Sequence, residues 1–80
     1  MDLAEYRWKK GVTYAEVARR VGCTKDHINR IALRRIKPGI HLATFIELAT
    51  EGIVTVEDLL RSYEEGQKEE EKEQEVNNLK

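Results

Sequence analysis

Two short helical patterns joined by a tight turn occupy the stretch from Tyr14 to Leu33. Apolar residues stand at the positions where two crossing helices must touch, and Ala18 is small where the second helix comes closest. Gly22 lies in the turn, where the backbone needs a positive φ. The apolar residues of this pattern are Val17, Val21, Cys23, Ile28 and Ile31. The stretch is therefore predicted to fold as two helices that cross over a common core.

Capping signals mark the starts of three helices. In a capping box, the first side chain accepts a hydrogen bond from a free amide of the first helical turn. Three pairs have this spacing: Asp2 with Glu5, Thr13 with Glu16, and Thr55 with Asp58. Three glycines just past the periodic segments mark helix ends. Basic residues occupy the last helical turn before the first two of these glycines, where they complement the helix dipole. These glycines are Gly11, Gly22 and Gly52.

The fold class is predicted to be all-α, because no segment alternates between apolar and polar residues as a strand would. We expect helices at about residues 2–10, 14–21, 25–34, 40–50 and 56–64. Pro38 disfavours helical geometry at Lys37, so residues 36–39 form the loop before the fourth helix. Apolar residues at three- and four-residue steps should form one core. They are Leu3, Tyr6, Val17, Val21, Ile28, Ile31, Leu42, Ile46, Ala49, Val54, Leu59 and Leu60.

Composition favours one small soluble domain, which we place at residues 1–63. A chain of 80 residues with 40% hydrophobic content suits a single helical core. No apolar run approaches the roughly 20 residues of a membrane span, and no apolar segment follows the first basic residues as in a signal peptide. The single cysteine, Cys23, cannot form an internal disulfide and suits a reducing compartment. We therefore expect a cytoplasmic protein.

The net charge of −1 hides an uneven distribution. Residues 1–40 hold ten Lys or Arg against four Asp or Glu, whereas residues 64–80 hold seven Glu against three Lys. The basic half creates a positive field that suits a polyanionic partner. Residues 64–80 form an acidic tail that we expect to be partly helical or disordered. This tail could be a solubilising extension, an interaction or dimerisation arm, or a DNA-mimicking autoinhibitor.

The pattern of residues 14–33 is typical of a DNA-binding helix-turn-helix, in which the second helix enters the major groove. Its polar residues fall on the outer face of the helix at 25–34. The candidate base-contacting residues are Lys25, Asp26, His27, Asn29 and Arg30. Lysine can donate a hydrogen bond to guanine, and aspartate can accept one from cytosine. Asparagine can bind adenine, and arginine can bind either guanine or a phosphate. The alternative is that these side chains form only a solvated helix face.

Phosphate contacts are expected on both sides of this helix. Thr13 and Tyr14 accompany the free amides at the start of the helix at 14–21, where a phosphate could bind. Basic residues after the helix at 25–34 could contact the DNA backbone, which fixes orientation rather than sequence. The candidate phosphate-contacting residues are Thr13, Tyr14, Thr24, Arg34, Arg35 and Lys37.

Metal binding and catalysis have little support in the sequence. Cys23 and His27 are four residues apart, but with His41 they still supply too few ligands for a metal site. No nucleophile, base and orienting group cluster together, and no glycine-rich phosphate loop is present. We therefore expect neither an enzyme nor a cofactor.

A second functional class is an adaptor that binds another protein through its surface helices and acidic tail. Tyr6 and Trp8 are expected to pack in the core or at its edge, although they could instead anchor a protein contact. Leu59, Leu60 and Tyr63 could leave an apolar edge on the last helix for dimerisation. The basic residues of the third helix argue against the adaptor.

The chain resembles the phage repressor and Cro-like helix-turn-helix family, also called xenobiotic-response-element regulators, over residues 1 to about 63. Beyond the helix pair, the likeness rests on the basic loop ending in Pro38, on Leu42-Ala43 and Ile46 in the next helix, and on residues 50–59, Thr-Glu-Gly-Ile-Val-Thr-Val-Glu-Asp-Leu.

This resemblance implies a five-helix repressor-like domain that binds a double-stranded DNA operator as a homodimer, with the helix at 25–34 in the major groove. Such a protein would be a bacterial or prophage transcription regulator. Tyr14, Asp26 and His27 depart from the residues common in the family. The operator sequence therefore does not follow from the resemblance.

Overall fold

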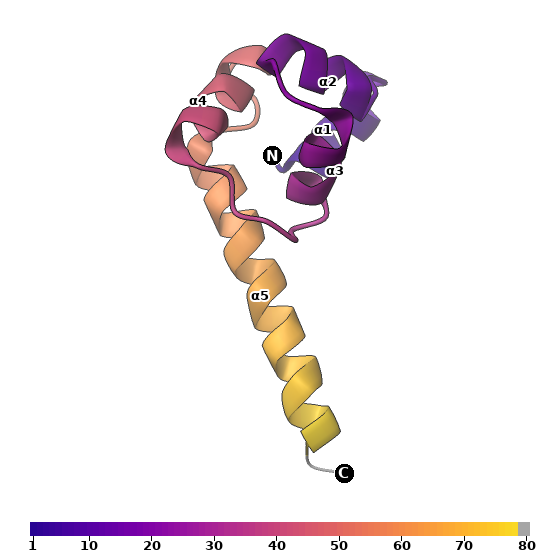
Figure 1. Ribbon diagram of the computed structural model, residues 1–80, viewed down its shortest axis with the longest axis vertical. Helices are drawn as coiled ribbons and strands as arrows, with labels where there is room; N and C mark the ends of the chain where they lie inside the picture. The colour runs from indigo at the N-terminus through magenta and orange to yellow at the C-terminus, as the bar shows by residue number, and fades with distance from the viewer. Residues whose placement is uncertain (79–80) are drawn as a thin grey trace.

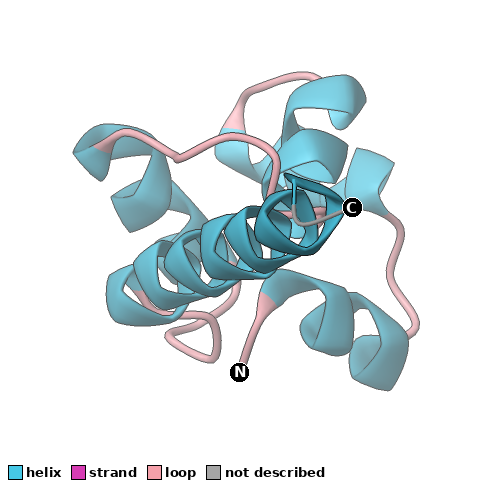
Figure 2. Cartoon of the chain, turned by 90° about the horizontal axis from the view of Figure 1, so that it is seen from below, coloured by secondary structure: helices cyan, strands magenta, loops and turns pink. Residues whose placement is uncertain are grey.

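A computed structural model describes residues 1–78, with side chains for residues 1–68, as helices joined by short loops. The described chain contains five helices and no strand, which confirms the all-α prediction (Figures 1 and 2). The helices are α1 (Leu3–Lys10), α2 (Tyr14–Val21), α3 (Lys25–Ala32), α4 (Ile40–Ala49) and α5 (Val56–Asn78). Of the helices described, none is both long and apolar enough to cross a membrane.

The predicted capping residues begin their helices, and a fourth cap is present. Asp2 accepts a hydrogen bond from the Glu5 amide at 2.8 Å, and Thr13 accepts one from the Glu16 amide at 3.1 Å. Thr24, which the sequence suggested only as a phosphate contact, caps α3 by accepting from the His27 amide at 3.2 Å. A reciprocal capping box forms at the start of α5. The Thr55 hydroxyl accepts a hydrogen bond from the Asp58 amide, and the Asp58 carboxylate accepts one from the Thr55 amide, each at 3.1 Å.

Left-handed residues end the first three helices. Gly11 and Gly22 have φ values of 65° and 93°, as expected for residues that close a helix. At α3 the left-handed residue is Arg34, with φ 64°, which lies one residue beyond the helix cap Leu33. The Arg34 amide donates to the Ile31 carbonyl and the Arg35 amide to the Arg30 carbonyl, each at 3.0 Å. Because this backbone arrangement closes the helix early, α3 ends at Ala32 rather than at residue 34 as predicted.

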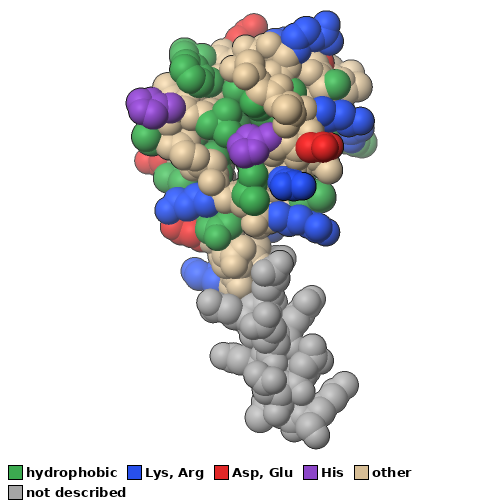
Figure 3. Space-filling view, in the orientation of Figure 1, with side chains coloured by type: hydrophobic (Ala, Val, Ile, Leu, Met, Phe, Trp, Pro, Cys, Tyr) green, Lys and Arg blue, Asp and Glu red, His purple; other side chains and the backbone are tan. Residues whose placement is uncertain are grey.

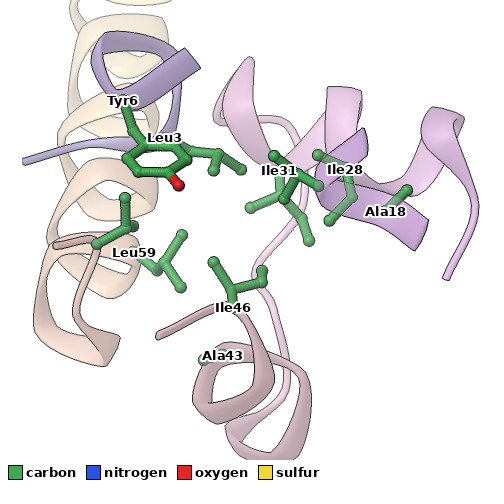
Figure 4. Packing of buried hydrophobic residues seen from close by; sticks show 10 residues of the cluster. Leu3, Tyr6, Ala18, Ile28, Ile31, Ala43, Ile46 and Leu59 are labelled. Carbon is green, nitrogen blue, oxygen red and sulfur yellow. The ribbon is translucent and has the colours of Figure 1, made fainter. Parts of the chain in front are cut away.

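One hydrophobic core joins all five helices (Figure 4). Ile28, Ala43, Ile46 and Val54 are fully buried, and the side chains labelled in Figure 4 point toward one another from every helix. Of the residues predicted for the core, four are only half-buried. These four are Val21, Leu42, Ala49 and Leu60.

The last helix is much longer than predicted. The expected end at about residue 64 is wrong, since α5 continues to Asn78. Glutamate, lysine and glutamine dominate residues 64–75 and have high helix propensity, so nothing local stops the helix. Gly66 lies within α5 and packs closely on Arg34. The helix projects beyond the body formed by α1–α4 and gives the chain an extent of 45 × 22 × 21 Å (Figure 1).

Candidate nucleic-acid interface

A three-residue turn, Gly22-Cys23-Thr24, fixes α3 against α2. The amides of Gly22 and Cys23 both donate to the Ala18 carbonyl, at 2.8 and 3.0 Å. Ala18 itself is 3% exposed, and its small side chain allows the two helices to pack closely. These two helices make the most extensive contact in the described structure. The position of α3 is therefore set by the hydrogen-bonded turn that precedes it and by its close packing on α2.

The two sides of α3 differ in polarity. Ile28 and Ile31 are buried, whereas Lys25, Asp26 and Arg30 are exposed. At 100° per residue, Asn29 lies between the exposed residues and is half-buried. His27 is half-buried too, but it lies at the opposite edge of the face, closer to Ile31. The structure therefore brings four of the five candidate base-contacting residues onto one arc, with His27 at the border.

The exposed cations of α3 differ from those of α2 in their partners. On α2, Arg19 and Arg20 both pair with Glu16, so their charge is partly neutralised. Within the part of the chain whose side chains are described, Lys25 and Arg30 form no ion pair. Figure 3 shows Lys and Arg side chains gathered at the right, over α1–α3, with acidic side chains among them. The cations of α3 are available to an incoming anion.

The start of α2 combines a threonine cap with an arginine held on an aromatic ring. Thr13 is exposed and Tyr14 is half-buried. The Arg7 guanidinium lies 4.8 Å from the centre of the Tyr14 ring, in cation–π contact. Arg7 also lines, with Trp8 and Thr13, an open pocket of about 270 Å³. The contact between Arg7 and Tyr14 crosses the turn between two helices, so no periodic pattern could have predicted it.

The three basic residues after α3 are in different environments. Arg35 and Lys37 are exposed in the loop before α4. Arg34 is half-buried, and its guanidinium lies 3.7 Å from the Asp2 carboxylate. The same arginine is packed against Gly66 of α5. Arg34 therefore links α1, α3 and α5, whereas Arg35 and Lys37 present their charge to solvent.

Two expectations about apolar residues are wrong. Tyr6 is in the core at 5% exposure, but Trp8 projects from α1 with 81% exposure, so it does not pack at the core. Leu59 is 3% exposed, which confirms its predicted place in the core and contradicts the suggestion that it forms an exposed edge on α5. Leu60 and Tyr63 are half-buried. Both errors arise because the helical period does not reveal which side of a helix the neighbouring elements cover.

The polar groups near this face suit hydrogen bonding rather than covalent chemistry. Cys23 is a free thiol whose pKa is raised by burial, so it stays protonated and is a weak nucleophile. In the range with described side chains, no three His, Cys, Asp or Glu residues are grouped so that they could hold a metal ion. The α3 arc instead offers an ammonium, a guanidinium, an amide and a carboxylate. These groups match the donors and acceptors of base edges and phosphates.

Comparisons with known proteins add no relative: no family profile, no curated protein and no solved structure matches this chain.

Proposed function

We propose that this chain is a sequence-specific DNA-binding transcriptional regulator of the phage repressor and Cro-like type. In this proposal α2 and α3 form a helix-turn-helix, α3 enters the major groove, and two copies occupy a palindromic operator in a bacterial cytoplasm. The centres of the two half-sites would be separated by about 34 to 36 Å.

The observation that supports this function best is the outward arc of α3. It carries Lys25 and Arg30 without neutralising partners among the described side chains, together with Asn29. A rigid helix that projects unpaired donors can enter a groove and distinguish base pairs, whereas a flexible loop would lose more entropy on binding. The neighbouring Arg35 and Lys37 are exposed and would contact phosphates.

Selection of bound sequences from random double-stranded DNA tests the proposal. We expect a short palindrome to be enriched, and the selected site then becomes the probe for variants. Arg30→Ala should weaken binding to that site by about 1–3 kcal/mol and relax the preference at one base pair, because a base contact is lost. Fluorescence anisotropy on the selected site and on random DNA measures both effects.

Arg19→Ala is the matched control for Arg30→Ala. Both residues are exposed arginines near the end of a helix, but Arg19 is paired with Glu16 on α2. Arg19→Ala should lower the affinity for DNA far less than Arg30→Ala does. If Arg30→Ala weakens binding equally on the selected site and on random DNA, Arg30 contacts a phosphate rather than a base. If no salt-sensitive binding occurs at micromolar protein, DNA binding is refuted and the protein-binding adaptor is favoured.

Salt dependence tests the electrostatic part of the proposal. If about four to six phosphates are neutralised per protomer, the logarithm of the affinity should fall steeply with the logarithm of the salt concentration, by about 0.9 for each contact. Arg35→Ala should reduce this slope by about 0.9 on any DNA sequence. Arg35 is preferred to Arg34 for this test, because Arg34 is also part of the contact with Asp2. A flat salt response would contradict the proposed phosphate contacts.

A further inference from the structure

A pocket lies between the loop before α4, the start of α4 and the first turns of α5 (Figure 1). Its volume of about 380 Å³ falls within the range of about 300–1,000 Å³ that is usual for small-molecule sites. Most of its wall is apolar, and the apolar residues that line it are Pro38, Ile40, Ala43, Val56 and Leu60. Pro38 and Ala43 are themselves buried, so part of the wall is fixed by the folded body.

A single cation stands at this apolar wall. Of the described side chains that line the pocket, Lys37 alone carries a charge. Lys37 is exposed and forms no ion pair with any side chain that the structure describes. The Val56 amide donates to the Glu47 carboxylate at 3.3 Å, so this amide is already satisfied. An anion that enters the pocket therefore meets the Lys37 ammonium as its partner.

We propose that this pocket binds a small amphipathic carboxylate, with its apolar body on the wall and its carboxylate at the Lys37 ammonium. The apolar body removes the wall from water, which a purely inorganic anion does not do. The ammonium makes a charge-assisted hydrogen bond, which fixes the orientation of the ligand. A neutral hydrocarbon leaves Lys37 without a partner, and a cation is repelled by it. The combination of wall and charge therefore selects an anion with an apolar body.

Occupation of the pocket opposes DNA binding, an effect that rests on the proposed function. Lys37 is one of the proposed phosphate contacts, and one ammonium cannot fully neutralise a ligand carboxylate and a phosphate together. Each of the two ligands then lowers the affinity for the other by the same factor. The chain responds to a small molecule in this way without a separate ligand-binding domain.

Titration of the ¹⁵N-labelled full chain with octanoate, followed by the amide shifts in two-dimensional NMR, tests the pocket itself. We expect saturable shifts at Lys37, Ala43 and Val56, with a dissociation constant on the order of 1 mM for so small a ligand. Leu48 should shift much less, because it is 68% exposed on α4 but does not line the pocket. Shifts that do not saturate, or that are as large at Leu48 as in the pocket, overturn the proposal.

Substitutions separate the charge from the apolar wall. Lys37→Met removes the ammonium and should weaken octanoate about three- to fivefold, while the binding of 1-octanol should not change. Lys68→Met is the matched control, since Lys68 is an exposed lysine of α5 that does not line the pocket. An octanoate affinity that is equal in the wild type and Lys37→Met, or equal in the two lysine variants, overturns the proposal.

A filled pocket provides a second test that does not depend on charge. Val56→Phe adds a ring to the wall and should weaken octanoate and 1-octanol alike. The NMR spectrum of the variant shows whether it is folded, and Leu60→Phe replaces it if it is not. Undiminished octanoate binding in a folded, filled variant contradicts the assignment of the ligand to this pocket.

The effect on DNA is measured separately, by fluorescence anisotropy on the selected DNA site with and without saturating octanoate. We expect the affinity for DNA to fall about two- to fivefold in the wild type and to stay unchanged in Lys37→Met. Acetate at the same concentration carries the charge without the apolar body, so it controls for ionic strength. Octanoate binding by a chain that does not bind DNA refutes the proposed function alone. A DNA affinity that octanoate leaves unchanged refutes the competition at Lys37.

Discussion

At the scale of single residues, buried polar contacts stabilise turns that the apolar pattern does not describe. Thr50 is 1% exposed at the end of α4. Its hydroxyl donates to the Ile46 carbonyl at 2.9 Å and accepts from the Val54 amide at 3.2 Å. It therefore supplies an acceptor for the buried Val54 amide in the loop after α4. Two left-handed residues, Glu51 and Gly52, complete the connection to α5.

Thr50→Val should destabilise the protein by about 1–3 kcal/mol, because the shape is kept while the buried Val54 amide loses its acceptor. Urea unfolding followed by circular dichroism measures the change. Thr44→Val is the control, since the Thr44 hydroxyl donates to a carbonyl on an exposed face. If the two variants lose the same stability, the buried network of Thr50 is not important.

Gly66→Ala tests the contact between α5 and the end of α3. In a free helix, alanine is favoured over glycine by about 1 kcal/mol. Here an added Cβ would lie 2.7 Å from the Arg34 Cβ, which is too close, and Arg34 is held by its own backbone position. Overpacking of this kind costs about 1–3 kcal/mol, so we expect net destabilisation in urea unfolding. A more stable Gly66→Ala variant would show that α5 does not pack there.

At the scale of elements, helix starts could be predicted better than helix ends. The caps at Asp2, Thr13 and Thr55 act within one helical turn, so the sequence predicts them directly. The end of α3 depends on Arg34 adopting a left-handed conformation, which is uncommon for a residue other than glycine. No residue type in this segment predicts such a helix end. The end of α5 was missed for a different reason: residues 64–80 carry few apolar side chains, so no packing was expected there, but their helix-favouring residues continue α5 to Asn78.

Thr24→Ala should destabilise the fold by about 1 kcal/mol, because the His27 amide loses its acceptor at the start of α3. Thermal unfolding without DNA isolates this effect from any phosphate contact of the same hydroxyl. Thr24→Ser keeps a capping oxygen and should retain most of the stability. A serine variant as unstable as the alanine variant would mean that the cap contributes little.

At the scale of the whole molecule, an ion pair joins the two ends of the folded body. The Met1 amine lies 2.8 Å from the Asp58 carboxylate, which connects the start of the chain to α5. This hydrogen bond, followed by the one from the Thr55 amide, lowers the pKa of Asp58. A carboxylate with a lowered pKa stabilises the fold fully above its unfolded value of about 3.9, and the contribution is lost as the pH falls through the folded value.

Asp58→Asn should therefore be less stable than the wild type at pH 7, and the difference should shrink as the pH falls through the lowered folded pKa of Asp58 and the wild-type carboxyl becomes neutral. Urea midpoints measured across this range give the comparison. Asp26→Asn removes an exposed carboxylate of α3 and controls for the change in net charge. A difference for Asp58→Asn that is independent of pH would contradict the role of the charged form.

Much of the candidate site was also predictable, but its electrostatics were not. The period of α3 placed Lys25, Asp26, Asn29 and Arg30 on one outer arc, and these residues do lie there. The sequence could not show that Arg34 meets Asp2 while Arg35 stays exposed. Adjacent residues outside a helix follow no fixed angular step, so their partners depend on where other elements pass.

By itself the sequence determined the all-α class, the number of helices and most of their starts, because caps and apolar periods act over only three or four residues. Only the tertiary structure decided which surfaces remain open. It exposed Trp8 and left Phe45 and Leu48 of α4 facing solvent. The physical reason is that burial depends on contacts between residues far apart in the chain, and a helical period fixes a face without saying what will cover it.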